Sequence, residues 1–136
     1  QILQVLQNLR ESTGIGLILI TPDLGMIAGN ADSVTVMYAG RAVEVGVVDD
    51  IFYHSRHPYT RGLLASLPKL DQREAMLFSI EGAPPSLVAR PSGCAFHPRC
   101  TYAVARCIAE DPRLRLVDTW RLGPLGFVWA AILVKE

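Results

Sequence analysis

Apolar residues recur at two different periods along the first part of the chain. Residues 1–11 place Ile, Leu and Val at helical spacing, and residues 12–14 supply a stop, which predicts an amphipathic helix. Residues 17–21 form a short, continuous run of branched apolar side chains, typical of a strand that is buried on both faces of a parallel sheet. Residues 34–38 form a second run of this kind. The alternation of helix and strand predicts an α/β fold.

Short polar segments separate these runs. Pro22 ends the first strand, and Asp23 is expected to cap a short helix over residues 24–27. Residues 39–40, Ala-Gly, fit a tight turn, and residues 41–46 alternate between polar and apolar. The pattern therefore predicts a hairpin after the second strand.

Two further helices are expected before the composition of the chain changes near residue 69. One covers residues 47–54, and a second begins at a Thr60 cap and ends at Leu67, before Pro68. From residue 69 onward, Pro and Gly interrupt the chain so often that long regular elements are not expected. We therefore divide the chain near residue 70, into residues 1–68 and an irregular extension, residues 69–136.

Composition narrows the class of protein. The chain has 136 residues, half of them apolar, and its 13 basic and 13 acidic side chains cancel, so the basic surface of a dedicated nucleic-acid binder is missing. No apolar run reaches the roughly 18 residues of a membrane span. The chain begins with Gln and shows no targeting segment, so we expect a piece of a longer protein. Its three cysteines suit thiol or metal chemistry in a reducing cytosol better than a disulfide framework.

Three segments, in order, carry a resemblance to a known family. Residues 17–25, which read LILITPDLG, together with residues 32–46 resemble the last third of an ABC transporter nucleotide-binding domain, where a core strand leads into the switch loop and a closing hairpin. Residues 51–64 contain His57-Pro58-Tyr59-Thr60 and are similar to a segment of oligopeptide, dipeptide and nickel importer ATPases. Residues 84–107, with their cysteines, resemble the C-terminal extension of the same subfamily.

The resemblance assigns a role to the loop after the first strand. In the family, the residue after the strand and its Thr is a His that contacts the γ-phosphate and helps to arrange the attacking water. This chain has Pro22 there, and a proline has neither a ring nitrogen to relay a proton nor a backbone N–H to donate. The adjacent Asp23 looks like a surviving catalytic acid, but helix capping needs the same residue in the same place. We therefore expect no intact catalytic residue in this loop.

The parts that bind nucleotide are missing from the sequence. It contains no G-x-x-x-x-G-K loop, no apolar strand that ends in Asp-Glu, and no Leu-Ser-Gly-Gly-Gln signature. The resemblance implies ATP and Mg²⁺ as ligands of the full-length family. We expect no ATPase activity from this chain alone, although it belongs with an ATPase family. His54, His57 and Tyr59 are not expected to form a catalytic set, because no nucleophile or carboxylate partner adjoins them.

Cys94, Cys100 and Cys107, with His97 between the first two, are candidate metal ligands. Members of the resembled subfamily carry a fourth Cys that completes an iron–sulfur site, whereas residues 127–131 of this chain read FVWAA. Two alternatives remain open. One is an iron–sulfur cluster in which His97 replaces the fourth Cys or one iron lacks a protein ligand. The other is a set of free thiols that remain from a site which has lost its fourth ligand. Because an incomplete ligand set loses most of its affinity, we favour free thiols.

Together these observations predict the distal part of a RecA-like P-loop NTPase domain, with a mainly parallel sheet, over residues 1–68. The resemblance implies a peripheral subunit on the cytoplasmic side of a bacterial inner membrane. Such a subunit pairs with a second ATP-binding subunit, docks on two permeases and couples ATP hydrolysis to the import of peptides or nickel. The competing hypotheses are a stand-alone metal or iron–sulfur module and a non-catalytic pseudo-subunit.

Overall fold

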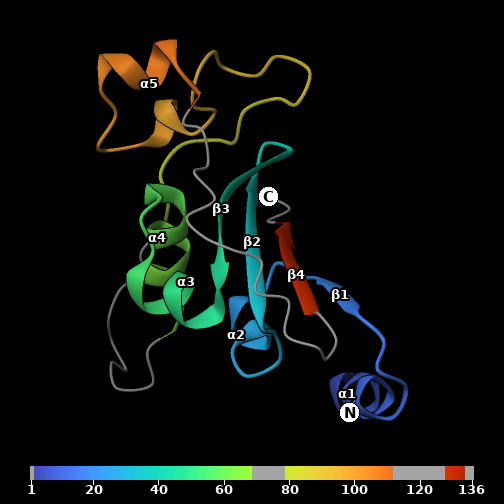
Figure 1. Cartoon of the computed structure of the whole chain (residues 1–136). Coiled ribbons are helices and arrows are strands. Elements are labelled where there is room, and N and C mark those ends of the chain that lie inside the picture. The colour runs from blue at the N-terminus through green and yellow to red at the C-terminus, as the bar shows by residue number, and fades with distance from the viewer. Residues whose placement is uncertain (1, 69–78, 112–127, 134–136) are drawn as a thin grey trace.

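The computed structural model describes residues 2–68, 79–111 and 128–133, and shows a small α/β arrangement (Figure 1). The expected boundary near residue 70 lies outside the described residues. The helices and strands of the described part are, in chain order, α1 (Ile2–Thr13), β1 (Leu17–Ile20), α2 (Leu24–Ile27), β2 (Ser33–Tyr38), β3 (Arg41–Val47), α3 (Val48–His54), α4 (Pro58–Ala65), the 3₁₀ turn η1 (His97–Arg99), α5 (Ala105–Ala109) and β4 (Val128–Leu133).

The strands form one sheet in the order β1-β4-β2-β3. β4 pairs in parallel with β1, where Leu17 is in register with Val128, and with β2, where Ser33 is in register with Trp129. β2 and β3 form the predicted antiparallel hairpin, and Ala39 and Gly40 at its turn have φ values of 48° and 74°. These positive φ values fit a two-residue turn whose twist matches that of the strands.

Two expectations about the sheet are wrong. The extension is not irregular throughout, because residues 128–133 form the strand β4. β4 lies between β1 and β2, the two strands that we expected to form the main parallel part of the sheet. β1 is also not buried on both faces: Ile18 is 64% exposed and Ile20 59% exposed. In the described structure, the face of β1 that carries Ile18 and Ile20 is therefore open to solvent.

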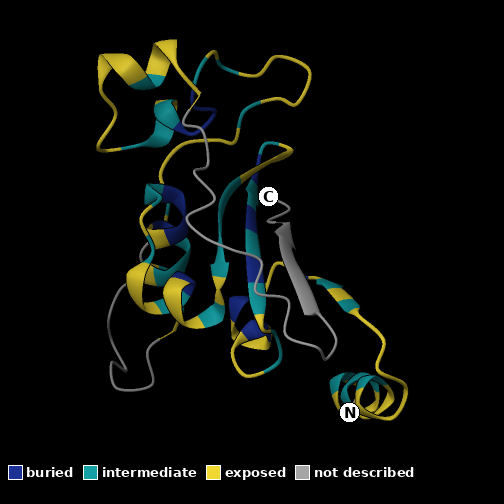
Figure 2. Ribbon diagram, in the orientation of Figure 1, coloured by how far each residue is buried: buried dark blue, intermediate teal, exposed yellow. Residues whose placement is uncertain are grey.

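The core lies between the hairpin, the short helices that follow it and part of the extension (Figure 2). The alternation along β2 buries Val34, Val36 and Tyr38 on one face. Ile27 of α2 and Ile51 of α3 are also almost fully buried. The period-2 pattern of β2 therefore packs one face of the hairpin against the helices.

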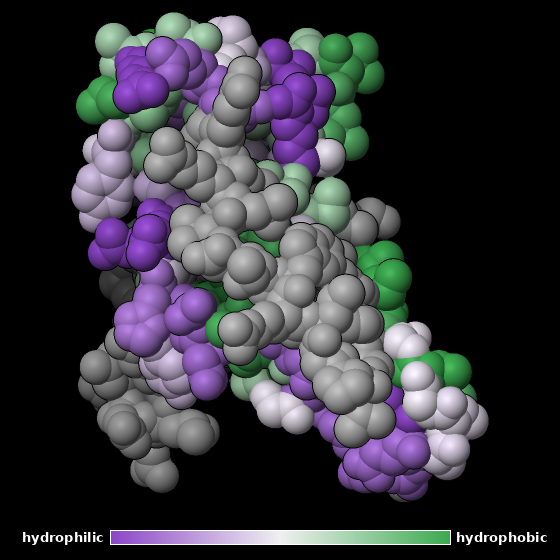
Figure 3. All heavy atoms as spheres, viewed as in Figure 1, coloured by the Kyte–Doolittle hydropathy of each residue, from purple (hydrophilic) through white to green (hydrophobic). Residues whose placement is uncertain are grey.

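The predicted amphipathic helix α1 forms, and the amide of Gly14 donates to the carbonyl of Arg10 at its end (2.8 Å). Its apolar stripe is not buried, however: Ile2 is 78% and Val5 65% exposed. Apolar surface is visible near α1 and β1, toward the lower right of the molecule (Figure 3). Among the described helices, none combines the length and the apolar character of a membrane span.

Candidate functional site

The loop after β1 is organised by side-chain to backbone hydrogen bonds. The Oγ1 of Thr21, which is buried, accepts from the amide of Asp23 (3.1 Å). The Oδ1 of Asp23 accepts from the amide of Gly25 (2.8 Å), so Asp23 is the N-cap of α2, as predicted. Pro22 is exposed between them. The carboxylate of Asp23 is therefore engaged in capping, and Pro22 presents no group that donates or relays a proton.

The His-Pro-Tyr-Thr segment forms the start of α4. His57 is the N-cap: its Nδ1 accepts from the amide of Tyr59 (3.2 Å), and Pro58 is the first helical residue. The expectation that Thr60 is the cap is wrong, because a proline at the first helical position moves the cap to the residue before it. Thr60 is instead fully buried, and its Oγ1 has no hydrogen-bond partner within the described ranges.

Glu44 of β3 fixes the chain where it enters α4. Its carboxylate accepts from the amide of Arg56 (2.6 Å) and from the amide of His57 (3.3 Å). Burial lowers the pKa of His57, and the charge of Glu44 opposes this shift only in part. The sequence analysis missed Glu44. Glu44 was visible only as one of the polar residues of the alternating strand, and that pattern does not identify the groups it contacts.

An aromatic cluster joins the end of β2, the start of α4 and the extension. The ring of Tyr38 lies 4.6 Å from that of Tyr59 and 5.2 Å from that of Phe96, and the rings of Tyr59 and Phe96 are 5.3 Å apart, centroid to centroid. All three side chains are buried. The His57 ring lies 6.0 Å from Phe96. Two of the segments that carry the family resemblance, one with His57 and one with Phe96, are therefore in contact.

Arg99 strengthens the same junction. Its guanidinium donates to the hydroxyl of Tyr38 (3.3 Å) and to the backbone carbonyls of Ile80 (3.0 Å) and Glu81 (2.9 Å). The loop that carries Pro22 takes no part in this junction. Figure 1 places α2 and the 79–111 segment near opposite ends of β2.

The three cysteines of the extension are free thiols. The amide of Cys94 donates to the carbonyl of Cys107 (2.9 Å), and the amide of Cys100 donates to the carbonyl of His97 (3.2 Å). Cys94 is buried, and burial raises the pKa of its thiol, with a smaller contribution in the same direction from the other two thiols. Cys100 and Cys107 are half-buried.

His97 is held in one orientation by the backbone. Its Nδ1 lies 2.8 Å from the carbonyl oxygen of Cys94, which can only accept, so Nδ1 donates, and in the neutral ring the lone pair is then on Nε2. This tautomer is the one in which Nε2 can bind a metal. Within residues 2–68, 79–111 and 128–133, however, no three or more His, Cys, Asp or Glu side chains are placed to hold a metal ion. Of residues 127–131, where the fourth ligand was sought, Phe127 lies outside the described residues.

Comparison with known proteins gives consistent matches. Residues 43–107 match the family described as "Oligopeptide/dipeptide transporter, C-terminal region". The chain is 47% identical, over 95% of its length, to the oligopeptide transport ATP-binding protein OppD of Haemophilus influenzae. Putative peptide import ATP-binding proteins of Brucella ovis and Brucella abortus are each 46% identical, over 87% and 85% of the chain. The chain spans 39%, 37% and 35% of the length of these three relatives.

Proposed function

Because this chain belongs to the oligopeptide/dipeptide ABC transporter family of ATP-binding proteins, we propose that it is part of a subunit that couples ATP hydrolysis to peptide import. The observation that carries this proposal is the 47% identity to an oligopeptide transport ATP-binding protein over 95% of the chain. A match of that extent covers the switch loop, the His-Pro-Tyr-Thr segment and the cysteine-bearing segment together. Nickel is the alternative cargo that the resemblance allows.

The proposed partners follow from this assignment. The complete subunit pairs with a second ATP-binding subunit and docks on two permeases at the cytoplasmic side of the bacterial inner membrane. Residues 1–68 then form the distal part of a RecA-like domain with a mainly parallel sheet, and residues 69–136 form the extension of the subfamily. Within residues 1–68 the described strand pairing is the antiparallel hairpin of β2 and β3, and the parallel pairings of β1 and β2 both run through β4 of the extension.

We further propose that this chain is inactive by itself. ATP and Mg²⁺ need a glycine-rich loop with its Lys and a carboxylate for the metal, and this sequence contains neither motif. Pro22 adds a second defect at the switch position, which favours a non-catalytic pseudo-subunit as the alternative role. A stand-alone metal module, with Cys94, Cys100, Cys107 and His97 as its candidate ligands, is the other alternative.

A chimera tests the assignment. The aligned part of the Haemophilus influenzae relative is replaced by this chain, so that a complete ATP-binding subunit results, and ATP hydrolysis and peptide uptake are measured with its partner subunits. We expect slow hydrolysis, and Pro22→His is expected to raise it by roughly 100-fold because the imidazole restores a donor near the γ-phosphate.

Pro22→Ala is the matched control, since it restores the backbone N–H without an imidazole. It should leave hydrolysis close to the level of the unsubstituted chimera. Equal turnover of the unsubstituted chimera and its Pro22→His variant would overturn the assignment of this loop. A chimera that fails to support uptake even with the Pro22→His substitution would overturn the assignment of the chain to the importer.

A further inference from the structure

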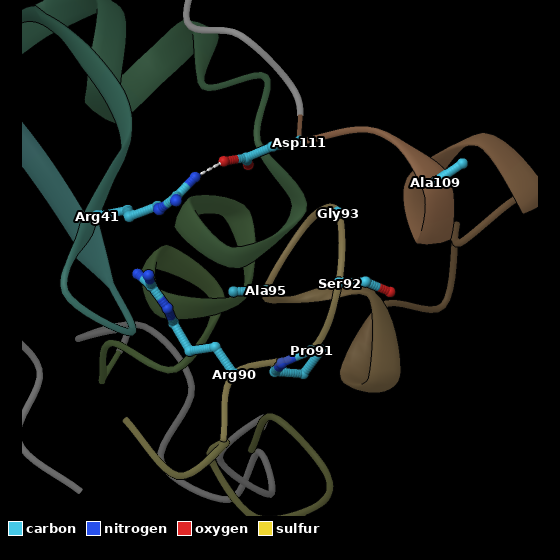
Figure 4. Close-up of a pocket in the computed structure, with 8 residues that line it drawn as sticks. All are labelled: Arg41, Arg90, Pro91, Ser92, Gly93, Ala95, Ala109 and Asp111. Carbon is cyan, nitrogen blue, oxygen red and sulfur yellow. Dashed lines mark hydrogen bonds and ion pairs between the residues drawn. The ribbon is translucent and has the colours of Figure 1, made fainter. Parts of the chain in front are cut away.

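A cavity of about 420 Å³ lies where the β2–β3 hairpin meets the extension (Figure 4). Arg41 reaches into it from the start of β3, and Asp111 closes it after the end of α5. Arg90 and Ser92 line it from the loop that precedes Cys94. The cavity is separate from the Pro22 loop and from the aromatic cluster, and neither the family assignment nor the proposed importer function gives it a ligand.

The charge of the lining is positive. Two guanidinium groups, those of Arg41 and Arg90, face one carboxylate, that of Asp111, although the chain as a whole has a formal net charge of zero. Guanidinium groups stay protonated at any physiological pH. The cavity therefore concentrates positive charge that the composition of the chain does not reveal, and it favours an anionic ligand.

Within the described part of the chain, both guanidinium groups are held by contacts that use one of their nitrogens. The Nη1 of Arg90 donates to the carbonyl of Ala39 in the hairpin turn (3.1 Å), and the Nη1 of Arg41 forms an ion pair with Asp111. A guanidinium carries five N–H donors in a planar fork, which suits two parallel hydrogen bonds to one oxyanion. The two side chains are thus positioned in advance, with donors to spare.

The wall of the cavity is built by close backbone packing. Gly93 has φ +65°, and a Cβ at this position would lie 2.4 Å from the carbonyl oxygen of Cys107. The hydroxyl of Ser92 donates to the carbonyl of Ile108 (3.1 Å). The loop of residues 90–93 is therefore held against α5. The pocket is thus formed before a ligand binds, and binding does not have to order it.

We propose that this cavity binds the phosphate group of a small phosphorylated metabolite. Two guanidinium groups match the double negative charge and the several oxygens of a phosphate monoester. The volume lies in the range of small-molecule sites and exceeds what one phosphate fills, so the phosphate is carried by a larger molecule. Asp111 competes with the ligand for Arg41, and its release from the ion pair accompanies binding.

Calorimetric titration of the chain with ribose 5-phosphate, inorganic phosphate and succinate tests the proposal. Ribose 5-phosphate should bind more tightly than inorganic phosphate, and both should bind more tightly than succinate. Arg41→Gln and Arg90→Gln should each weaken the binding of ribose 5-phosphate about tenfold or more, because each removes charge-assisted hydrogen bonds. Asp111→Asn should strengthen binding, because it removes the competing carboxylate.

Matched controls come from Arg106 of α5 and Glu110, which follows the helix; these two side chains form an exposed ion pair and do not line the cavity. Arg106→Gln and Glu110→Gln make the same changes in net charge and should leave the affinity within about twofold of the parent chain.

Thermal unfolding of each variant separates lost binding from lost structure, and the expected gain in Asp111→Asn cannot arise from unfolding. Any of three results would overturn the proposal: no binding of either phosphate probe, tighter binding of succinate, or an equal effect of Arg41→Gln and Arg106→Gln. None of these results depends on transport, so the proposed importer function stands or falls separately.

Discussion

At the scale of single residues, His57 makes the stability of the chain depend on pH. Its Nδ1 must be unprotonated to accept from the amide of Tyr59, and burial lowers its pKa below the ordinary value of 6.5. A lowered folded-state pKa means that this contribution is complete above pH about 6.5 and is lost as the pH falls through the folded-state value. We expect the cap, worth about 1 kcal/mol, to disappear on acidification, as measured by urea unfolding between about pH 7.5 and about pH 5.

His57→Asn is the control, since Asn caps helices at all these pH values. It should reduce the pH dependence while it keeps the stability near neutral pH. An unaltered pH profile in His57→Asn would contradict the role given to this ring.

The three thiols should differ in reactivity because they differ in burial. Burial raises the pKa of Cys94 and shields its sulfur from a reagent, whereas the side chains of Cys100 and Cys107 are only half-buried. With iodoacetamide at neutral pH, peptide mapping by mass spectrometry should find Cys100 and Cys107 modified before Cys94. In urea the three rates should converge. Protection of all three until a chelator is added would instead indicate a bound metal.

Residue by residue, the sequence predicted local contacts and missed distant ones. The Asp23 cap was predictable because its acceptor and the amide of Gly25 are two residues apart. The contacts of Glu44 with residues 56 and 57, and the packing of Phe96 against Tyr38 and Tyr59, depend on how separate elements pack. No spacing rule within one element reports such contacts.

At the scale of elements, Gly93 sets how closely the 90–93 loop approaches α5. We expect Gly93→Ala to destabilise the chain by about 1–3 kcal/mol, because it combines a strained positive φ with a Cβ placed against the carbonyls of Cys107 and Ile108. Gly29→Ala is the matched control, since Gly29 also has positive φ (+79°) but nothing lies within 4 Å of its Cβ position in the described structure. The difference between the two variants in urea unfolding measures the close approach alone. Equal losses would show that φ strain accounts for the whole effect.

The helices and strands of the first half were predictable because their periods are clear. The hairpin of β2 and β3, the short α2 and the acidic start of α3 lie where the patterns placed them. The start of α4 was misplaced because the proline before Tyr59 outweighs the capping preference of Thr60. β4 was missed because Pro and Gly interrupt the extension so often that its apolar residues do not predict a strand. The pattern also does not indicate which strands such a segment would pair with.

At the scale of the whole molecule, β4 links two parts of the sheet that do not pair with each other within the described residues. β1 pairs with β4, and β4 pairs with β2. Deletion of residues 128–136 should therefore release β1, while the β2–β3 hairpin and its helices keep their packing. Thermolysin should cleave the truncated chain within residues 14–20 sooner than the parent chain. Deletion of residues 134–136 alone is the control, and unchanged protection of β1 in the longer deletion would contradict this role of β4.

The position of β4 also bears on how the chain folds. β1 pairs with β4 only after Leu17 comes into register with Val128, and these two residues are far apart in the sequence. Pairings between such distant residues form slowly, because the intervening chain must first close into a loop. During that delay the edge of β1, with Ile18 and Ile20, is free to pair with another copy of the same chain. Refolding yield should thus fall as protein concentration rises.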